Sequence, residues 1–135
     1  MRTIDVFFYG LFMDESLLRA KGLHPVNFRK ASVQGLELRI GDRAALVPES
    51  SGRVHGMVAS LSHAEVEHLY AEPGLRNYRP EAVLAHFADG AVAAALCFNL
   101  LEPPAVGERN PEYAAKLRAL AARLDFPAEY VASIR

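Results

Sequence analysis

The sequence predicts a small mixed α+β domain built on a largely antiparallel sheet or barrel. Its short apolar segments are rich in β-branched and aromatic residues, and most are separated by turns of hairpin length. Three or four segments with helix-capping signals are interspersed among them. At 135 residues, 51% of them hydrophobic, the chain is long enough for one buried core and too short for two. We therefore expect a single mixed α/β domain over residues 1–135.

The chain begins with a predicted strand, a loop and a short helix. Residues 4–9 are apolar and aromatic, and they indicate a largely buried strand that ends at Gly10. The loop occupies residues 10–13. Asp14 then stands at an N-cap position and opens a helix that ends near Gly22.

The middle of the chain alternates strands and turns before a second helix. Strands are predicted at residues 28–40, 44–47 and 54–61. The Pro-Glu-Ser-Ser-Gly segment at 48–52 predicts a break between the last two strands. Ser62 and Glu65 have the spacing of a capping box and predict a helix that continues through Tyr70.

The last part of the chain predicts a loop, a hairpin and a long helix. Pro73 and Gly74 mark the loop. The hairpin has strands at residues 78–87 and 91–100, joined by a turn at Asp89-Gly90. Asn110, as N-cap, and Pro111, at the first helical position, begin the clearest helix, and a short final turn follows Pro127.

Charge and composition argue against several partners. The net charge is −1, from 15 Lys and Arg against 16 Asp and Glu, so no excess of positive charge is available for nucleic-acid phosphates. No apolar stretch reaches the roughly 18 residues that a membrane-spanning helix needs. The single Cys97 cannot form an intramolecular disulfide, and we recognise no secretory leader. We expect a cytoplasmic protein that binds neither nucleic acid nor membrane.

Common catalytic arrangements are not indicated. The five histidines lack metal-ligand spacing, since His63 and His68 are five residues apart and leave a common helical face. No G-x-S-x-G motif is present. Cys97 lies in an apolar run, which favours a buried strand position over a reactive thiol. We predict no metal site.

Two loops are the remaining candidates for a site. The loop at residues 10–13 leads into a helix, so its N–H groups are suited to a carboxylate or phosphate, although a glycine here is also typical of a simple turn. Glu72 follows an apolar helix end and precedes Pro73-Gly74. It either projects into a cleft as a general base or is simply solvated.

Taken together and in order, these segments resemble the γ-glutamylcyclotransferase-like superfamily, which includes the plant AIG2-like proteins. Tyr9-Gly10 is similar to the Y-G-S-L or Y-G-S-N loop of that family, and Leu69-Tyr70-Ala71-Glu72 to its L-D-x-x-E-G segment. Further similar segments are VHGMVASL at 54–61, YRPEAV at 78–83, NPEY at 110–113 and FPAEYV at 126–131.

The resemblance implies a small mixed, largely antiparallel β-barrel flanked by helices and an acyltransferase-type reaction without a cofactor. The α-amine of a small γ-glutamyl substrate attacks the side-chain amide carbonyl, which gives 5-oxoproline and a free amine or amino acid. Glu72 is implied as the general base. The implied substrate-binding residues are Tyr9, Gly10, Leu11, Phe12, Tyr78 and Tyr113, although the tyrosines are also natural core or rim residues.

The chain departs from the family pattern at two places, and two alternative functions follow. Leu11, followed by the bulky Phe12, stands where the family usually has Ser or Thr after Tyr-Gly. Pro73 separates Glu72 from Gly74, whereas glycine commonly follows the acid directly in the family. One alternative is a non-catalytic domain of the same fold that binds a small carboxylate or a partner protein. The other is an enzyme that removes a γ-glutamyl group in a biosynthetic pathway.

Overall fold

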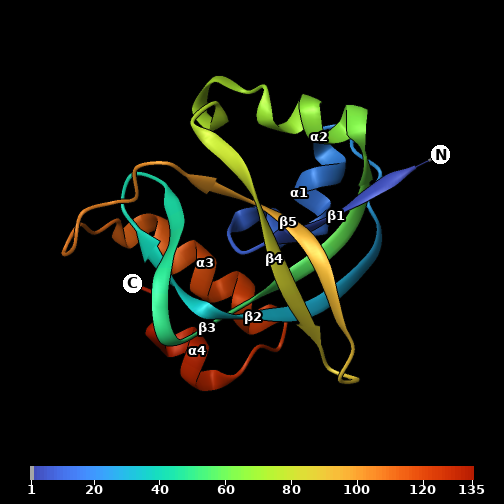
Figure 1. Cartoon of the computed structure of the whole chain (residues 1–135). Coiled ribbons are helices and arrows are strands. Elements are labelled where there is room, and N and C mark those ends of the chain that lie inside the picture. Colours follow the sequence, from blue (N-terminus) through green and yellow to red (C-terminus); the bar gives the residue numbers. More distant parts are fainter. Residues whose placement is uncertain (1) are drawn as a thin grey trace.

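Five strands close into a barrel in the computed structural model, which describes residues 2–135 (Figure 1). The strands are β1 (Thr3–Phe8), β2 (Val26–Ile40), β3 (Ala44–Ser62), β4 (Tyr78–Phe87) and β5 (Val92–Leu100). Their order around the barrel is β1-β3-β2-β4-β5. Neighbours are antiparallel except β1 and β5, which run parallel and meet at Val6 and Leu96. The predicted antiparallel barrel is confirmed.

Helices and short 3₁₀ turns connect β1 to β2 and β3 to β4, and two further helices follow β5. They are η1 (Leu11–Met13), α1 (Glu15–Ala20), α2 (His63–Tyr70), η2 (Pro73–Leu75), α3 (Pro111–Arg123) and α4 (Ala128–Ser133). The predicted caps are present: the Asp14 carboxylate accepts from the Ser16 N–H at 3.0 Å, and Ser62 forms a capping box with Glu65. The Asn110 side chain accepts from the Tyr113 N–H at 3.2 Å.

The predicted break at residues 48–52 is wrong, because β3 continues through it. A tight turn at residues 41–43 joins β2 to β3. The pairing then shifts from Leu36–Pro48 to Gln34–Arg53, so residues 49–52 lie opposite Gly35 alone. Gly35 has φ +85°, which favours glycine. Residues 49–52 therefore form a bulge inside one long hairpin and do not end a strand.

The predicted loop at residues 10–13 also differs, because it contains η1. The Met13 N–H donates to the Gly10 carbonyl at 3.0 Å, and the Asp14 N–H donates to the Leu11 carbonyl at 3.1 Å. The strand therefore leads into one 3₁₀ turn and then, through Asp14, into α1. This compact connection holds the loop against the end of the barrel.

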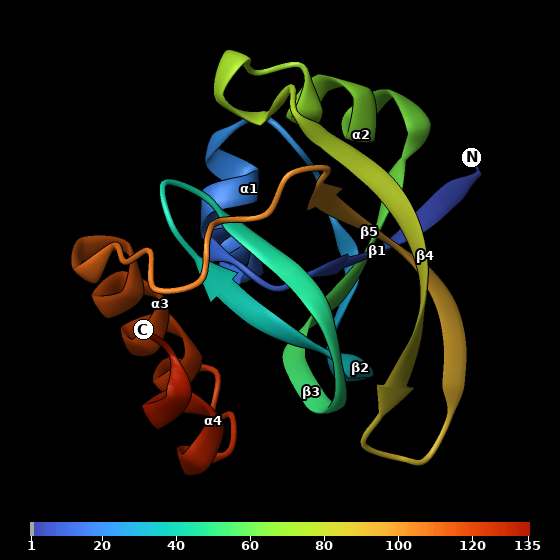
Figure 2. The same cartoon turned by 60° about the vertical axis from the view of Figure 1, so that its left-hand side comes forward.

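The core fills the barrel and extends beneath the helices. Leu18 of α1 and Leu117 of α3 are fully buried, with no exposed surface. α3 and α4 lie together at one side of the barrel, while α2 lies at the opposite side (Figures 1 and 2). Cys97 is buried as predicted, and burial raises the pKa of its thiol to about 12. Within residues 2–135, every helix is too short or too polar to cross a membrane.

Candidate functional site

A cavity of about 260 Å³ lies where β1 ends and η1 begins. This volume is slightly below the range of about 300–1,000 Å³ that is typical of sites for drug-sized ligands, so the cavity suits a small molecule. Most of its lining is aromatic or aliphatic. The predicted substrate-binding residues Tyr9, Gly10, Leu11, Phe12, Tyr78 and Tyr113 all line it. The fold thus brings the loop after β1 together with β4 and α3.

Two tyrosine hydroxyls in the lining are fixed by backbone carbonyls. The Tyr9 hydroxyl donates to the Phe98 carbonyl at 2.8 Å, and the Tyr78 hydroxyl donates to the Ala44 carbonyl at 2.5 Å. Burial raises the pKa of both phenols far above neutrality, so both stay protonated. Since each hydroxyl proton is already donated, what remains for a ligand is the oxygen lone pairs. These two residues are acceptors rather than bases.

The Tyr113 hydroxyl packs on the backbone of the loop at Gly10. A Cβ atom at Gly10 would lie 2.7 Å from the Tyr113 hydroxyl oxygen, closer than ordinary contacts allow. Burial raises the pKa of Tyr113, and a hydrogen bond with the Leu11 backbone lowers it in part. Tyr113 of α3 therefore places a hydroxyl beside Gly10 and Leu11, in a loop where the Leu11 side chain has no hydroxyl.

The lining carries two cations, which sequence reasoning missed. Lys21 ends α1, and its ammonium lies 5.8 Å from the centroid of the Phe12 ring. Arg43, in the turn between β2 and β3, donates its Nε–H to the Gly74 carbonyl at 3.0 Å. Within the described part of the chain, no carboxylate joins them in the lining. The lining itself thus carries only positive side chains, and Glu72 outside the lining balances the charge of Lys21.

A helical spacing could have revealed Lys21. Leu17 and Lys21 are four residues apart and line the same cavity, as positions on one face of a helix do. No sequence pattern pointed to Arg43. The turn that carries it lies next to the cavity only because the strands close into a barrel.

Glu72 lies at the rim of the cavity rather than among its lining residues. Its Oε1 atom is 2.6 Å from the Nζ atom of Lys21, and the Glu72 side chain is 42% exposed. Pro73 begins η2 directly afterwards, and Glu72 occupies the extended position before this turn. The Glu72 carboxylate thus lies outside the cavity but is bound to Lys21, which lines it.

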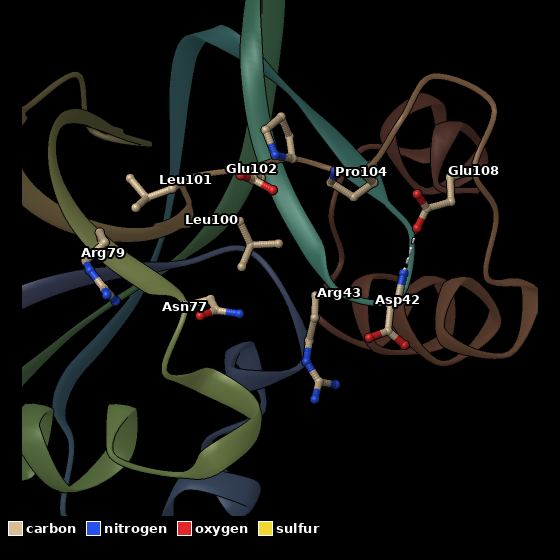
Figure 3. A pocket seen from close by; sticks show the side chains of 10 residues that line it. Asp42, Arg43, Asn77, Arg79, Leu100, Leu101, Glu102, Pro104 and Glu108 are labelled. Atoms are coloured by element: carbon tan, nitrogen blue, oxygen red, sulfur yellow. Dashed lines mark hydrogen bonds between the residues drawn. The ribbon is translucent and has the colours of Figure 1, made fainter.

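A second, larger hollow of about 510 Å³ shares Arg43 with the first. Figure 3 shows Arg43 and Asp42 on one side of Leu100, with Asn77 and Arg79 on the other. The Glu108 carboxylate accepts from the Asp42 N–H at 3.1 Å and fixes the turn at residues 41–43. This hollow is more polar than the first and lacks its aromatic lining.

The protein is thus a small α+β barrel with an aromatic-lined pocket beside a glycine-containing loop. A family model described as "Gamma-glutamyl cyclotransferase, AIG2-like" matches residues 6–116. The chain belongs to this AIG2-like γ-glutamyl cyclotransferase family. A comparison with curated protein sequences found no match.

Solved structures share the fold at low sequence identity. One, titled "Gamma-glutamyl cyclotransferase", has a TM-score of 0.78 and 16% identity, covering 99% of this chain and 89% of that chain. YkqA from Bacillus subtilis has a TM-score of 0.77 and 23% identity over 97% of this chain and 52% of its own. A solution structure from Arabidopsis thaliana has a TM-score of 0.68 and 20% identity, with coverage of 94% and 96%. These likenesses establish the fold.

Proposed function

We propose that this protein is a γ-glutamyl cyclotransferase that converts the γ-glutamyl group of an amine or peptide to 5-oxoproline, with Glu72 as general base. The reaction forms a bond between the α-amine nitrogen and the γ-carbonyl carbon and breaks the bond from that carbon to the leaving nitrogen. Family membership supports the reaction class. The observation that carries the proposal for this chain is the polar arrangement of the 260 Å³ cavity.

The polar groups of the cavity suit the amino-acid end of a γ-glutamyl group. An α-ammonium is a donor, and the Tyr9 and Tyr78 oxygens offer lone pairs to it. An α-carboxylate is an anion, and Lys21 and Arg43 are the cations of the lining. Acceptors and cations in one small cavity therefore favour a zwitterion over a purely apolar ligand.

The ring closure makes modest chemical demands on the protein. Nucleophile and electrophile belong to one molecule, so the site has to hold a folded conformer, move a proton and stabilise an oxyanion. The backbone N–H groups of residues 10–12 precede the hydrogen-bonded pattern of η1, and that of Leu11 is already engaged by the Tyr113 hydroxyl. The N–H groups of Gly10 and Phe12 are therefore the oxyanion donors we propose. This chemistry has no step that calls for a cofactor.

A carboxylate is the base that this site offers. The lining tyrosines are protonated at neutral pH, and burial raises the pKa of the Cys97 thiol to about 12. Glu72 is held at the rim by Lys21. In the proposed reaction Glu72 first takes one proton from the bound α-ammonium and leaves the neutral amine that attacks the γ-carbonyl. The proton that this nitrogen loses on forming the ring passes to the leaving nitrogen, and Glu72 then gives its own proton to the released amine, so the step balances without a co-reactant.

The position of Glu72 also favours one alternative function. Because its carboxylate is bound to Lys21 and does not line the cavity, the same site is suited to holding a small carboxylate without reaction. An enzyme that removes a γ-glutamyl group in biosynthesis uses the same chemistry and differs only in its leaving group.

Incubation with a panel of γ-glutamyl amines, amino acids and peptides tests the proposal. Mass spectrometry then measures 5-oxoproline. Because Asp42 is a second exposed carboxylate near the cavity, Asp42→Asn serves as the rival-base variant beside Glu72→Gln. We expect 5-oxoproline from at least one compound and a loss of turnover in Glu72→Gln alone. Binding of the panel without any 5-oxoproline supports the non-catalytic alternative.

A further inference from the structure

Lys21 is placed to contact both a ligand in the cavity and the carboxylate at its rim. It closes the C-terminal end of α1, where a cation is favoured, and its side chain is 28% exposed. Leu17, one turn earlier, directs the same face of α1 into the cavity. The Phe12 ring lies beneath the ammonium at 5.8 Å. The lysine is therefore anchored at the cavity wall.

Lys21 is also better placed than Arg43 to receive an anion in the cavity. Arg43 is exposed, lines both hollows and donates its Nε–H to the Gly74 carbonyl. Lys21 lines only the aromatic cavity of these two hollows, and its ammonium has three donors, of which Glu72 engages one. An anion that enters the aromatic cavity thus meets a partly buried ammonium that has donors besides the one that Glu72 engages.

The ion pair between Lys21 and Glu72 is of a kind that a ligand can replace. Its partners are 28% and 42% exposed, and ion pairs at such positions add little net stability. A ligand carboxylate carries the same charge as Glu72, so it can replace Glu72 beside Lys21 with little loss of stability. Because exchange requires only side-chain rotation at the rim, the barrel need not move.

We propose that Lys21 binds the α-carboxylate of the γ-glutamyl group and thereby releases Glu72 to act on the α-amine. This inference rests on the proposed function and adds a substrate-binding residue to it. In the free protein Lys21 holds Glu72 at the rim, so the base is set free only when the carboxylate of a substrate takes its place. Substrate binding and activation of the base are then one event.

Binding of 5-oxoproline tests the role of Lys21 without turnover. Calorimetry compares 5-oxoproline with its neutral carboxamide analogue in the parent protein and in Lys21→Met, Lys21→Arg and Lys116→Met. Lys116 is a matched control, since it is exposed on α3 and pairs with Glu112. We expect the parent, Lys21→Arg and Lys116→Met to prefer the carboxylate by about 10-fold or more, and Lys21→Met to lose this preference. Circular dichroism confirms that each variant is folded.

Kinetics separate the role of Lys21 from that of Glu72. With a substrate of the panel, Lys21→Met is expected to raise KM about 10-fold or more with little change in kcat, whereas Glu72→Gln lowers kcat. Should no compound give 5-oxoproline, the proposed function fails while the carboxylate preference still tests Lys21. The inference is overturned if the parent protein shows no carboxylate preference or if Lys21→Met retains it.

Discussion

Replacing Gly10 by alanine tests the contact between the loop and α3. Gly10 has a φ of −112°, outside the left-handed region that favours glycine, so the main cost of a side chain here is the space that it needs. The added Cβ would lie 2.7 Å from the Tyr113 hydroxyl oxygen. Overpacking of this kind costs about 1–3 kcal/mol, offset by about 0.4–1 kcal/mol from the reduced freedom of the unfolded chain. We expect Gly10→Ala to destabilise the fold by about 1–2 kcal/mol.

A second variant removes the atom that causes the clash. In Tyr113→Phe the hydroxyl is gone, so Gly10→Ala made in that background should be neutral or slightly stabilising. The coupling in this double-mutant cycle is then about 1–3 kcal/mol, well above the roughly 0.3–0.5 kcal/mol within which independent sites add. Urea unfolding followed by circular dichroism measures it, since the chain has no Trp for fluorescence. Equal effects of Gly10→Ala in both backgrounds would refute the contact.

Three further predictions concern the fold around the site. Leu117→Ala, at a fully buried position, should cost about 2–5 kcal/mol in urea unfolding, whereas Leu101→Ala, at a position 71% exposed, should change stability by less than about 0.5 kcal/mol. Burial raises the pKa of Glu65, but hydrogen bonds to the carboxylate, including one from Ser62, lower it by more. The Glu65 carboxylate therefore adds to the free energy of unfolding above its ordinary pKa of about 4.3, and this contribution is lost as the pH falls. Glu65→Gln should lower the stability by about 1 kcal/mol at pH 7 and be as stable as the parent protein below about pH 4. The buried Cys97 thiol, with its pKa raised to about 12, should resist a thiol reagent at pH 8 until urea unfolds the chain; rapid labelling of the native protein would contradict its burial.

Local signals allowed most of the elements to be predicted. The N-caps at Asp14, Ser62 and Asn110 act within one helical turn, so the sequence alone is enough to place them. The bulge at residues 49–52 was misjudged because Pro, Ser and Gly mark both turns and bulges. Only the pairing with β2 on both sides tells the two apart.

The site was predictable where one segment supplies it. The loop at Gly10 follows a strand and precedes a cap, so local order made it a candidate, and the family resemblance added Tyr78 and Tyr113, which line the same cavity. The positions of Lys21 and Arg43 and the ion pair with Glu72 depend on contacts between distant segments. Lys21 and Glu72 are separated by 51 positions. Such pairs depend on how the barrel closes, and closure joins β1 to β5 across most of the chain.

The rate at which the protein releases 5-oxoproline from a γ-glutamyl substrate, compared between Glu72→Gln and Glu67→Gln, tests the central claim most directly. Glu67 is exposed on α2 and controls for the loss of one nearby negative charge. We predict that Glu72→Gln lowers kcat by about 100- to 10,000-fold, the usual contribution of a general base, while Glu67→Gln stays within about twofold of the parent. Equal rates in the parent and Glu72→Gln would contradict the assignment of the base, and no 5-oxoproline from any γ-glutamyl compound would contradict the reaction itself.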